Sequence, residues 1–127
     1  MADLQLDFEK GNGLIPVIVQ EFETNDILML AYVNEEALKK TIETGDAHYW
    51  SRSRDKIWRK GESSGNVQKV KDIYVDCDAD TLVYRIEQIG GAACHKGYVS
   101  CFHRKVVNGK LELKDQPVFD PKEVYKE

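Results

Sequence analysis

Most side chains able to bind a metal ion lie between residues 76 and 104. This stretch holds all three cysteines of the chain, two of its three histidines and three aspartates at alternate positions, namely Cys77, Cys94, Cys101, His95, His103, Asp76, Asp78 and Asp80. Carboxylate oxygens suit hard cations, whereas thiolates suit softer ones. The residue types therefore predict metal chemistry that involves two different ions.

The three aspartates recur at every second position. In an extended chain, alternate side chains point to the same face, so Asp76, Asp78 and Asp80 would converge there. Mg²⁺ is the natural partner of such a set, and a solvated acidic turn is the alternative. Glu87 falls at position twelve counted from Asp76, as in an EF-hand calcium loop. Thr81 occupies the position that requires glycine, however, and the flanks resemble strands, which disfavours that interpretation.

The cysteines suggest a second site. In an extended chain Cys77 points away from the aspartates, and Cys94 and Cys101 are spaced more widely than a Cys-x-x-Cys pair. Three protein ligands leave a fourth tetrahedral position for water, which is the pattern of catalytic zinc. His95, next to Cys94, is the candidate for proton transfer. The alternatives are small buried thiols and a structural, hydrogen-bonded histidine.

Residues 51–61 form the most basic stretch, with five basic side chains and one acidic side chain. Arginine and hydroxyl groups suit phosphate, tryptophan rings can stack on a base, and the glycine- and serine-rich residues 61–65 can bring backbone N–H groups to a phosphate. The alternative is a solvated basic pair of strands. The candidate substrate-binding residues are Trp50, Ser51, Arg52, Arg54, Lys60, Glu62 and Ser64.

Strands predominate among the elements that must position these residues. Apolar runs and alternation predict strands at residues 14–20, 27–33, 47–52, 56–59, 70–76, 82–88, 98–107 and 110–113. Asn34 and Gly45 delimit a helix over residues 35–44, and Asp120-Pro121 is expected to start a short C-terminal helix. The pattern indicates a strand-rich α+β fold with a strongly bent antiparallel or mixed sheet, or a partial barrel.

Length and composition narrow the class of protein. A chain of 127 residues fits one domain over residues 1–127, and a net charge of −4 argues against nucleic-acid binding. The sequence contains no apolar run of membrane-spanning length and no recognisable signal peptide. An odd number of cysteines fits a reducing cytoplasm.

Five segments, in this order, resemble the phosphoribosyl-AMP cyclohydrolase family of histidine biosynthesis. They are AYVNEEAL at 31–38, YWSRSR at 49–54, WRKGESSGN at 58–66, DCDAD at 76–80 and CHKGYVSCF at 94–102. The resemblance covers residues 14 to 105. Asn66 departs from it, because many members have histidine there. The chain is too short for the fused pyrophosphohydrolase domain of some members, so we expect a monofunctional enzyme.

The resemblance implies Mg²⁺ on Asp76, Asp78 and Asp80, and one Zn²⁺ per subunit on Cys77, Cys94 and Cys101. It also implies an intertwined homodimer in which Cys77 crosses to the partner subunit. The implied reaction hydrolyses the N1–C6 bond of phosphoribosyl-AMP to give phosphoribosylformimino-aminoimidazole carboxamide ribotide, the third step of the pathway. In it, zinc-activated hydroxide would attack C6, while Mg²⁺ and the basic residues hold phosphates.

Two other functions remain open from the sequence. A zinc nucleobase deaminase would use a similar hydroxide, but its His-x-Glu and Pro-Cys-x-x-Cys motifs are absent. A non-catalytic zinc or thiol redox module would account for the cysteines and leave the aspartates unexplained.

Overall fold

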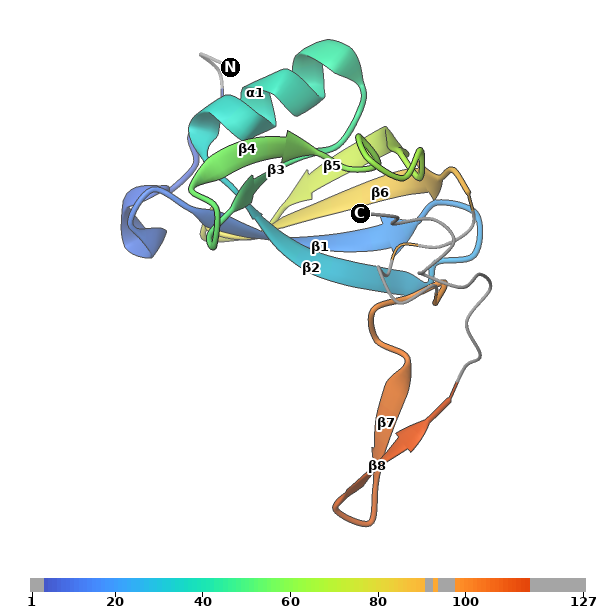
Figure 1. Cartoon of the computed structure of the whole chain (residues 1–127). Helices are drawn as coiled ribbons and strands as arrows, with labels where there is room; N and C mark the ends of the chain where they lie inside the picture. The colour runs from blue at the N-terminus through green and yellow to red at the C-terminus, as the bar shows by residue number, and fades with distance from the viewer. Residues whose placement is uncertain (1–3, 91–92, 94–97, 115–127) are drawn as a thin grey trace.

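The computed structural model describes residues 4–90, 93 and 98–114. These residues form one α-helix, one 3-10 turn and eight strands (Figure 1). In chain order the elements are η1 (Glu9–Gly11), β1 (Ile15–Glu21), β2 (Ile27–Val33), α1 (Glu35–Thr44), β3 (His48–Ser51), β4 (Lys56–Arg59), β5 (Gln68–Val75), β6 (Leu82–Gln88), β7 (Arg104–Val107) and β8 (Lys110–Leu113).

A four-stranded mixed sheet forms the centre of the fold, with strand order β2-β1-β6-β5. The β1–β2 and β5–β6 pairs are antiparallel, whereas β1 and β6 are parallel. Pro16 pairs with Tyr32 of β2, and the pairing with β6 begins only at Val17, so the missing N–H of Pro16 interrupts no bond to β6. The mixed α+β fold is confirmed. The sheet stays open at β2 and β5, so the described chain forms no closed barrel.

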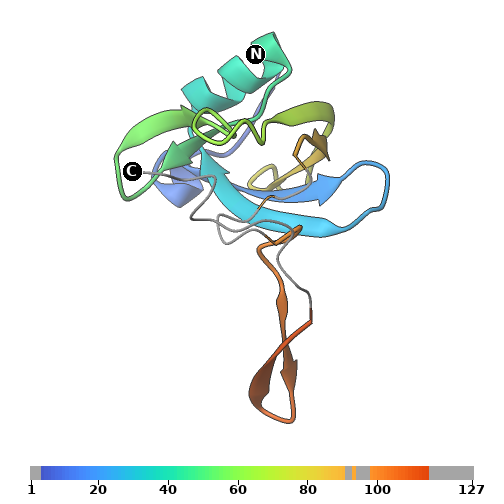
Figure 2. The same ribbon diagram turned by 45° about the vertical axis from the view of Figure 1, so that its right-hand side comes forward.

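The hydrophobic core lies between this sheet and the elements above it. Alternate residues of β1 and β6 are buried, as strand periodicity predicts, and α1 contributes Ala37 and Leu38. Figures 1 and 2 show α1 and the β3–β4 hairpin over the same face of the sheet. The ring of Tyr49 on β3 is fully buried in this layer and lies 5.9 Å from that of Tyr84 on β6.

Helix α1 has the predicted bounds because both of its ends are capped. The side chain of Asn34 accepts a hydrogen bond of 2.8 Å from the N–H of Ala37, which satisfies a donor of the first turn. Gly45 takes a left-handed conformation at the other end, and its N–H bonds to Thr41. The chain leaves the helix directly into β3, which carries part of the pocket described below.

The β7–β8 hairpin projects from the opposite side of the sheet (Figures 1 and 2). Asn108 and Gly109 both have positive φ, as the predicted two-residue turn requires. The predicted strand 98–107 is too long, because β7 begins only at Arg104. Ser100 is responsible in part: its hydroxyl donates to the Ile27 carbonyl and accepts from the N–H of Phe102, which turns the chain locally.

No helix in the described ranges is long and apolar enough to cross a membrane. The helix expected from Asp120-Pro121 falls outside the described residues.

Candidate metal and phosphate sites

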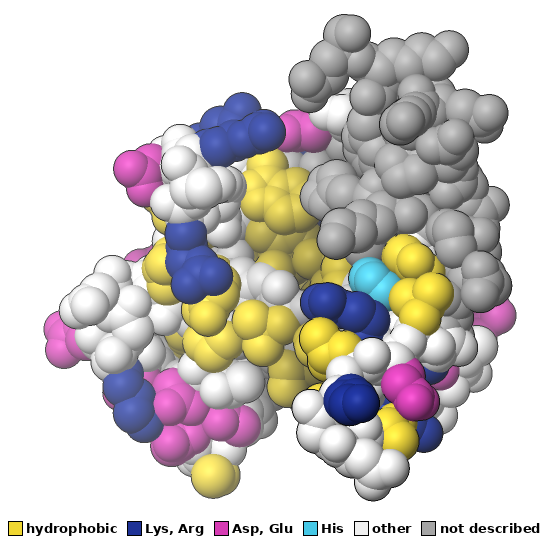
Figure 3. All heavy atoms as spheres, turned by 60° about the horizontal axis from the view of Figure 1, so that its bottom comes forward, with side chains coloured by type: hydrophobic (Ala, Val, Ile, Leu, Met, Phe, Trp, Pro, Cys, Tyr) yellow, Lys and Arg dark blue, Asp and Glu magenta, His cyan; other side chains and the backbone are white. Residues whose placement is uncertain are grey.

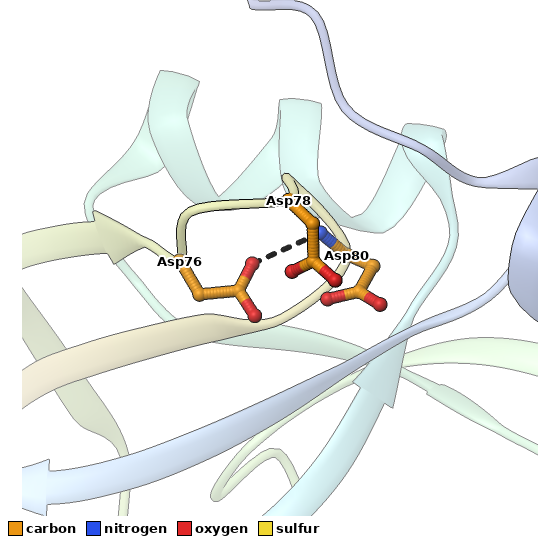
Figure 4. Close-up of side chains that lie close together, drawn as sticks. All are labelled: Asp76, Asp78 and Asp80. Carbon is orange, nitrogen blue, oxygen red and sulfur yellow. Dashed lines mark hydrogen bonds between the residues drawn. The ribbon is translucent and has the colours of Figure 1, made fainter.

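The three aspartates meet in the turn between β5 and β6 (Figure 4). One carboxylate oxygen of each residue lies within 4.8 Å of the others. Convergence is therefore confirmed, but the extended backbone expected for this segment is wrong. Val75 pairs with Leu82, so residues 76–81 must reverse the chain, and Ala79 has a positive φ of 60°.

Asp76 organises the turn that carries the cluster. Its Oδ1 accepts the N–H groups of Asp80 at 3.0 Å and Thr81 at 3.2 Å. The Ala79 N–H also donates to the Asp76 carbonyl at 3.2 Å. These bonds fold the loop back over its first residue, so that the alternate aspartates share one side without forming a strand.

Lys10 of η1 also contacts this cluster. Its Nζ lies 2.7 Å from Asp80 Oδ2 and 3.2 Å from Asp78 Oδ2. The hydrogen bond from Lys10 is the main cause that lowers the pKa of Asp80 to about 2. At Asp76, partial loss of solvent and the neighbouring carboxyls of Asp80 and Asp78 raise the pKa, against the two backbone N–H bonds. The pKa values of Asp76 and Asp80 are therefore shifted in opposite directions, and only that of Asp80 is lowered by Lys10.

The strands on both sides contradict the calcium-loop alternative. Glu87 lies within β6 and pairs with Lys69 of β5, so it cannot act as the closing ligand of a helix-flanked loop.

The structure describes two of the three predicted zinc ligands. Cys77 and Cys101 are both exposed, and Cys94 and His95 fall outside the described residues. Cys77 shares the turn with the aspartates, but among described residues the group of neighbouring ligand atoms contains the carboxylates only. Cys101 is anchored through its backbone N–H, which donates to the Leu28 carbonyl at 2.6 Å. The predicted set of zinc ligands remains a prediction.

A pocket of about 260 Å³ lies between the β3–β4 hairpin and the loop that follows it. Ten residues line it, namely Ser51, Arg54, Lys56, Trp58, Arg59, Lys60, Gly61, Glu62, Ser63 and Ser64. Five of the seven predicted substrate residues are among them. Trp50 and Arg52 are not, and the Arg52 guanidinium lies 4.0 Å above the ring of Tyr32. The run of basic residues in the sequence indicated this pocket, but it could not show that, of the two arginines in the turn between β3 and β4, only Arg54 lines it.

Two of the backbone N–H groups that we expected to wrap a phosphate at residues 61–65 bond to the protein itself. The N–H of Glu62 donates to Arg59 and that of Gly65 donates to Gly61, at 3.1 and 2.8 Å. These two donors are therefore engaged by carbonyls of β4 and of the loop itself. Gly61 is required sterically, since it has a φ of +88° and a Cβ there would lie 2.4 Å from the nitrogen of Val67. A phosphate-binding role for the other N–H groups of this loop stays a prediction.

Lys60 occupies an unexpected environment for a substrate lysine. It is only 2% exposed, and its Nζ donates to the carbonyl of Ala93 at 2.7 Å. Ala93 directly precedes Cys94 in the sequence. Lys60 therefore joins the wall of the pocket to the start of the predicted zinc-binding segment.

Sequence reasoning missed a buried polar network behind the pocket. The hydroxyl of Tyr49 donates to Gln68, and Gln68 donates to Gln88 at 2.9 Å. Gln88 in turn donates to the carbonyl of Asn66 at 2.9 Å. Two glutamines at facing positions of β5 and β6 were the available signal, because buried amides need partners. The network holds the end of the pocket loop against the central sheet.

Fold and site together define an α+β protein with a carboxylate cluster and a pocket lined by basic side chains. The family model of phosphoribosyl-AMP cyclohydrolase matches residues 29–103, which include both the pocket and the aspartate turn. The chain belongs to this family of histidine-pathway hydrolases.

Relatives with the same name match almost end to end. A phosphoribosyl-AMP cyclohydrolase of Desulfatibacillum aliphaticivorans is 61% identical, over 97% of this chain and 98% of its own length. One from Desulfotalea psychrophila is 55% identical, over 96% of this chain and 97% of its own length. A third, from Methanothermobacter thermautotrophicus, is 55% identical, over 91% of this chain and 84% of its own length. The family resemblance noted in the sequence is thereby confirmed.

Proposed function

We propose that this protein hydrolyses the N1–C6 bond of phosphoribosyl-AMP and so opens its adenine ring, the third step of histidine biosynthesis. The observation that carries the proposal is the family match over residues 29–103. The ribosyl group on N1 gives the ring amidinium character and makes C6 electrophilic. The protein must therefore orient a doubly phosphorylated nucleotide and bring a water molecule to C6.

The pocket supports the first of these tasks. Arg54, Lys56 and Arg59 line it from β4 and the preceding turn, and all three are exposed. Guanidinium groups bind phosphate in a bidentate manner, which fixes orientation as well as charge. Trp58 offers an aromatic face beside them. We assign a phosphate-bearing end of the substrate to this pocket, with Ser51, Glu62 and Ser64 as polar contacts.

The aspartate turn fits a magnesium ion. Carboxylate oxygens are the donors that Mg²⁺ prefers, and Asp76, Asp78 and Asp80 each present one within 4.8 Å of the others. Magnesium bound there would supply positive charge for a second phosphate group. Asp76 holds the turn in shape through its backbone bonds, so the loop geometry does not depend on the ion alone.

The thiols suit zinc in chemical type, and the exposure of Cys77 and Cys101 leaves both accessible to an ion. Together with Cys94 they would form a three-thiolate site. Zinc there would make hydroxide available near neutral pH. His95 is our candidate for moving the accompanying proton, since histidine can exchange protons in this pH range.

A homodimer is part of the proposal, with Cys77 donated across the interface. Figure 3 shows hydrophobic side chains on the face from which the β7–β8 hairpin projects. A groove of about 890 Å³ along β2 includes Ile27, Leu30 and Phe102, which are 54%, 48% and 49% exposed. On the hairpin, Val106 and Leu111 are also exposed. Apolar surface of this extent favours a protein partner, and a second copy gives the symmetric arrangement that Cys77 exchange needs.

The direct test is to incubate the purified protein with phosphoribosyl-AMP, Mg²⁺ and Zn²⁺ and to follow loss of the intact purine chromophore. AMP is the matched control, because it lacks the N1 substituent that activates C6. Conversion of phosphoribosyl-AMP with AMP left intact supports the proposal. Equal stability of both nucleotides, in protein with its zinc bound, contradicts it.

Family membership favours this hydrolase over the deaminase and over a non-catalytic redox module. A cytoplasmic location remains a prediction.

A further inference from the structure

A cation of the protein itself lies at the aspartate cluster. The ammonium group of Lys10 is 2.7 Å from Asp80 Oδ2 and 3.2 Å from Asp78 Oδ2. Lys10 comes from the 3-10 turn η1, far from the aspartates in sequence. The contact therefore depends on the fold and does not follow from local chain geometry.

The backbone around Lys10 is docked on the aspartate turn. The N–H of Asp7 donates to the carbonyl of Ala79 at 2.7 Å, which places the N-terminal segment directly on the residue between Asp78 and Asp80. The side chain of Asp7 accepts the N–H of Lys10 at 3.1 Å. The turn η1 is capped by Asn12, whose N–H donates to the Glu9 carbonyl at 3.0 Å. Three hydrogen bonds donated by backbone N–H groups thus hold the segment that presents Lys10 to the carboxylates.

This position conflicts with a bound metal. Magnesium takes carboxylate oxygens at about 2.0–2.1 Å in strict octahedral geometry. An ammonium group in contact with two of the three carboxylates occupies directions that the ion or its water molecules would need, and it repels a dication. Three carboxylates and one ammonium still leave two negative charges, so the cluster keeps its attraction for Mg²⁺.

We propose that Lys10 is an intramolecular competitor of Mg²⁺, which neutralises the aspartates in the metal-free protein and must be displaced when the ion binds. The inference rests on the proposed magnesium role of Asp76, Asp78 and Asp80. Its consequence is a weakened affinity for Mg²⁺ and a metal-free turn that is held together without the ion.

The expected effect is modest because these ion pairs reach solvent. The side chains of Lys10 and Asp78 are each 55% exposed and that of Asp80 is 21% exposed. Exposed pairs are weak, so removing Lys10 should tighten Mg²⁺ binding by about two- to tenfold.

The test is isothermal titration of metal-free protein with MgCl₂ at constant ionic strength, without substrate. Wild type is compared with Lys10→Met, with Asp78→Asn, and with Lys39→Met as a control. Lys39 is exposed on α1 and forms no ion pair with any described residue, so this control matches the change in net charge. We expect Lys10→Met to lower the Kd, Lys39→Met to leave it unchanged, and Asp78→Asn to raise it.

Urea unfolding with and without Mg²⁺ supplies an independent readout. Saturating Mg²⁺ should raise the free energy of unfolding more in Lys10→Met than in wild type. By linkage, this difference must equal the difference between their free energies of Mg²⁺ binding. An unchanged or higher Kd in Lys10→Met, with wild-type binding lost in Asp78→Asn, overturns the competition while preserving the magnesium site. Wild-type affinity retained in Asp78→Asn instead removes the magnesium assignment, and the competition fails with it.

Discussion

Asp78 and Cys77 are neighbours in the chain, yet we assign them to different ions. Asp78→Asn removes one charged oxygen ligand and leaves every thiol in place. Loss of a charge-assisted contact should weaken Mg²⁺ binding by roughly 10- to 100-fold and lower activity at limiting Mg²⁺. Zinc content, measured by elemental analysis, should stay near that of wild type. Loss of zinc and magnesium together would show that the two sites are one.

Lys10 and Asp80 give a prediction about pH. The pKa of the Asp80 carboxyl is about 2 in the folded protein against an ordinary value of 3.8. The folded state is therefore stabilised by ionised Asp80 above about pH 4, and this contribution is lost as the pH falls from 4 towards 2. Without metal, the ¹³C signal of the Asp80 carboxyl should stay flat down to about pH 3. In Lys10→Met it should titrate nearer 4; identical curves would show that Lys10 does not acidify Asp80.

His95 carries the proposed proton transfer. If its imidazole moves a proton in the chemical step, His95→Ala should lower kcat by about 10²–10⁴-fold while zinc content and folding remain. Single-turnover kinetics of the zinc-loaded variant measure the step directly. Near-normal turnover would leave His95 as a neighbour of Cys94 without a chemical role.

For single residues, the chemistry that a side chain can perform was easier to predict from the sequence than the direction in which it points. Alternate spacing correctly predicted that the aspartates converge, although a turn and not a strand brings them together. Arg52 and Arg54 are equivalent by composition, yet only Arg54 lines the pocket. The burial of Lys60 against Ala93 depends on a contact between distant segments, which no local pattern records.

Among the elements, those with local stop signals were predicted best. Asn34 and Gly45 determine both ends of α1, and Asn108-Gly109 determines the β7–β8 turn, because each residue satisfies a specific backbone requirement. The start of β7 was wrong, since the hydroxyl of Ser100 bonds to β2, an element distant in sequence. The strand order could not be predicted from the sequence either, because the parallel β1–β6 pairing joins segments that are far apart in the chain.

The contact between Gly90, which follows β6, and Asn66, which follows the pocket loop, gives a prediction about stability. Gly90 has a φ of +83°, and a Cβ there would lie 1.9 Å from Asn66 Oδ1. Gly90→Ala combines left-handed backbone strain with this clash, so it should lower the free energy of unfolding by about 2–5 kcal/mol. Urea denaturation of the metal-free protein measures the loss.

A matched glycine separates the two causes. Gly45 has a similar φ of +77° with nothing within 4 Å of its hypothetical Cβ, so Gly45→Ala should show the backbone strain alone, about 1–2 kcal/mol. If the clash with Asn66 causes the additional loss, adding Gly90→Ala to an Asn66→Ala background should cost much less stability than Gly90→Ala costs in the wild type. Equal losses in the two glycine variants would mean that Asn66 moves aside without cost.

For the whole molecule, the exposed apolar surface and the position of Cys77 both bear on whether two subunits share each zinc site. Cys77 lies in the β5–β6 turn, whereas Cys101 is anchored to Leu28 of β2, and these are the opposite edge strands of the sheet. Placement on opposite edges favours ligands contributed by two subunits over ligands contributed by one. In a symmetric dimer, such an exchange makes two equivalent sites.

Mixed dimers test this arrangement. Cys77→Ser and Cys94→Ser homodimers each have both sites damaged and should be inactive. In a mixed dimer, one site combines both lesions, while the other receives Cys77 from one chain and Cys94 and Cys101 from the other. Refolding equal amounts together should make about half of the dimers mixed, with one intact site of two, so about a quarter of wild-type activity should return.

The strength of this experiment is that neither parent can produce the signal. Each variant refolded alone measures the background, and differently tagged chains purified in tandem show that mixed dimers have formed. The isolated mixed dimer should bind about one zinc ion and have about half of the wild-type activity, because one of its two sites is complete. A mixed dimer as inactive as its parents would place all three thiolates on one chain. The β5–β6 turn would then have to approach residues 94–101 within a single subunit.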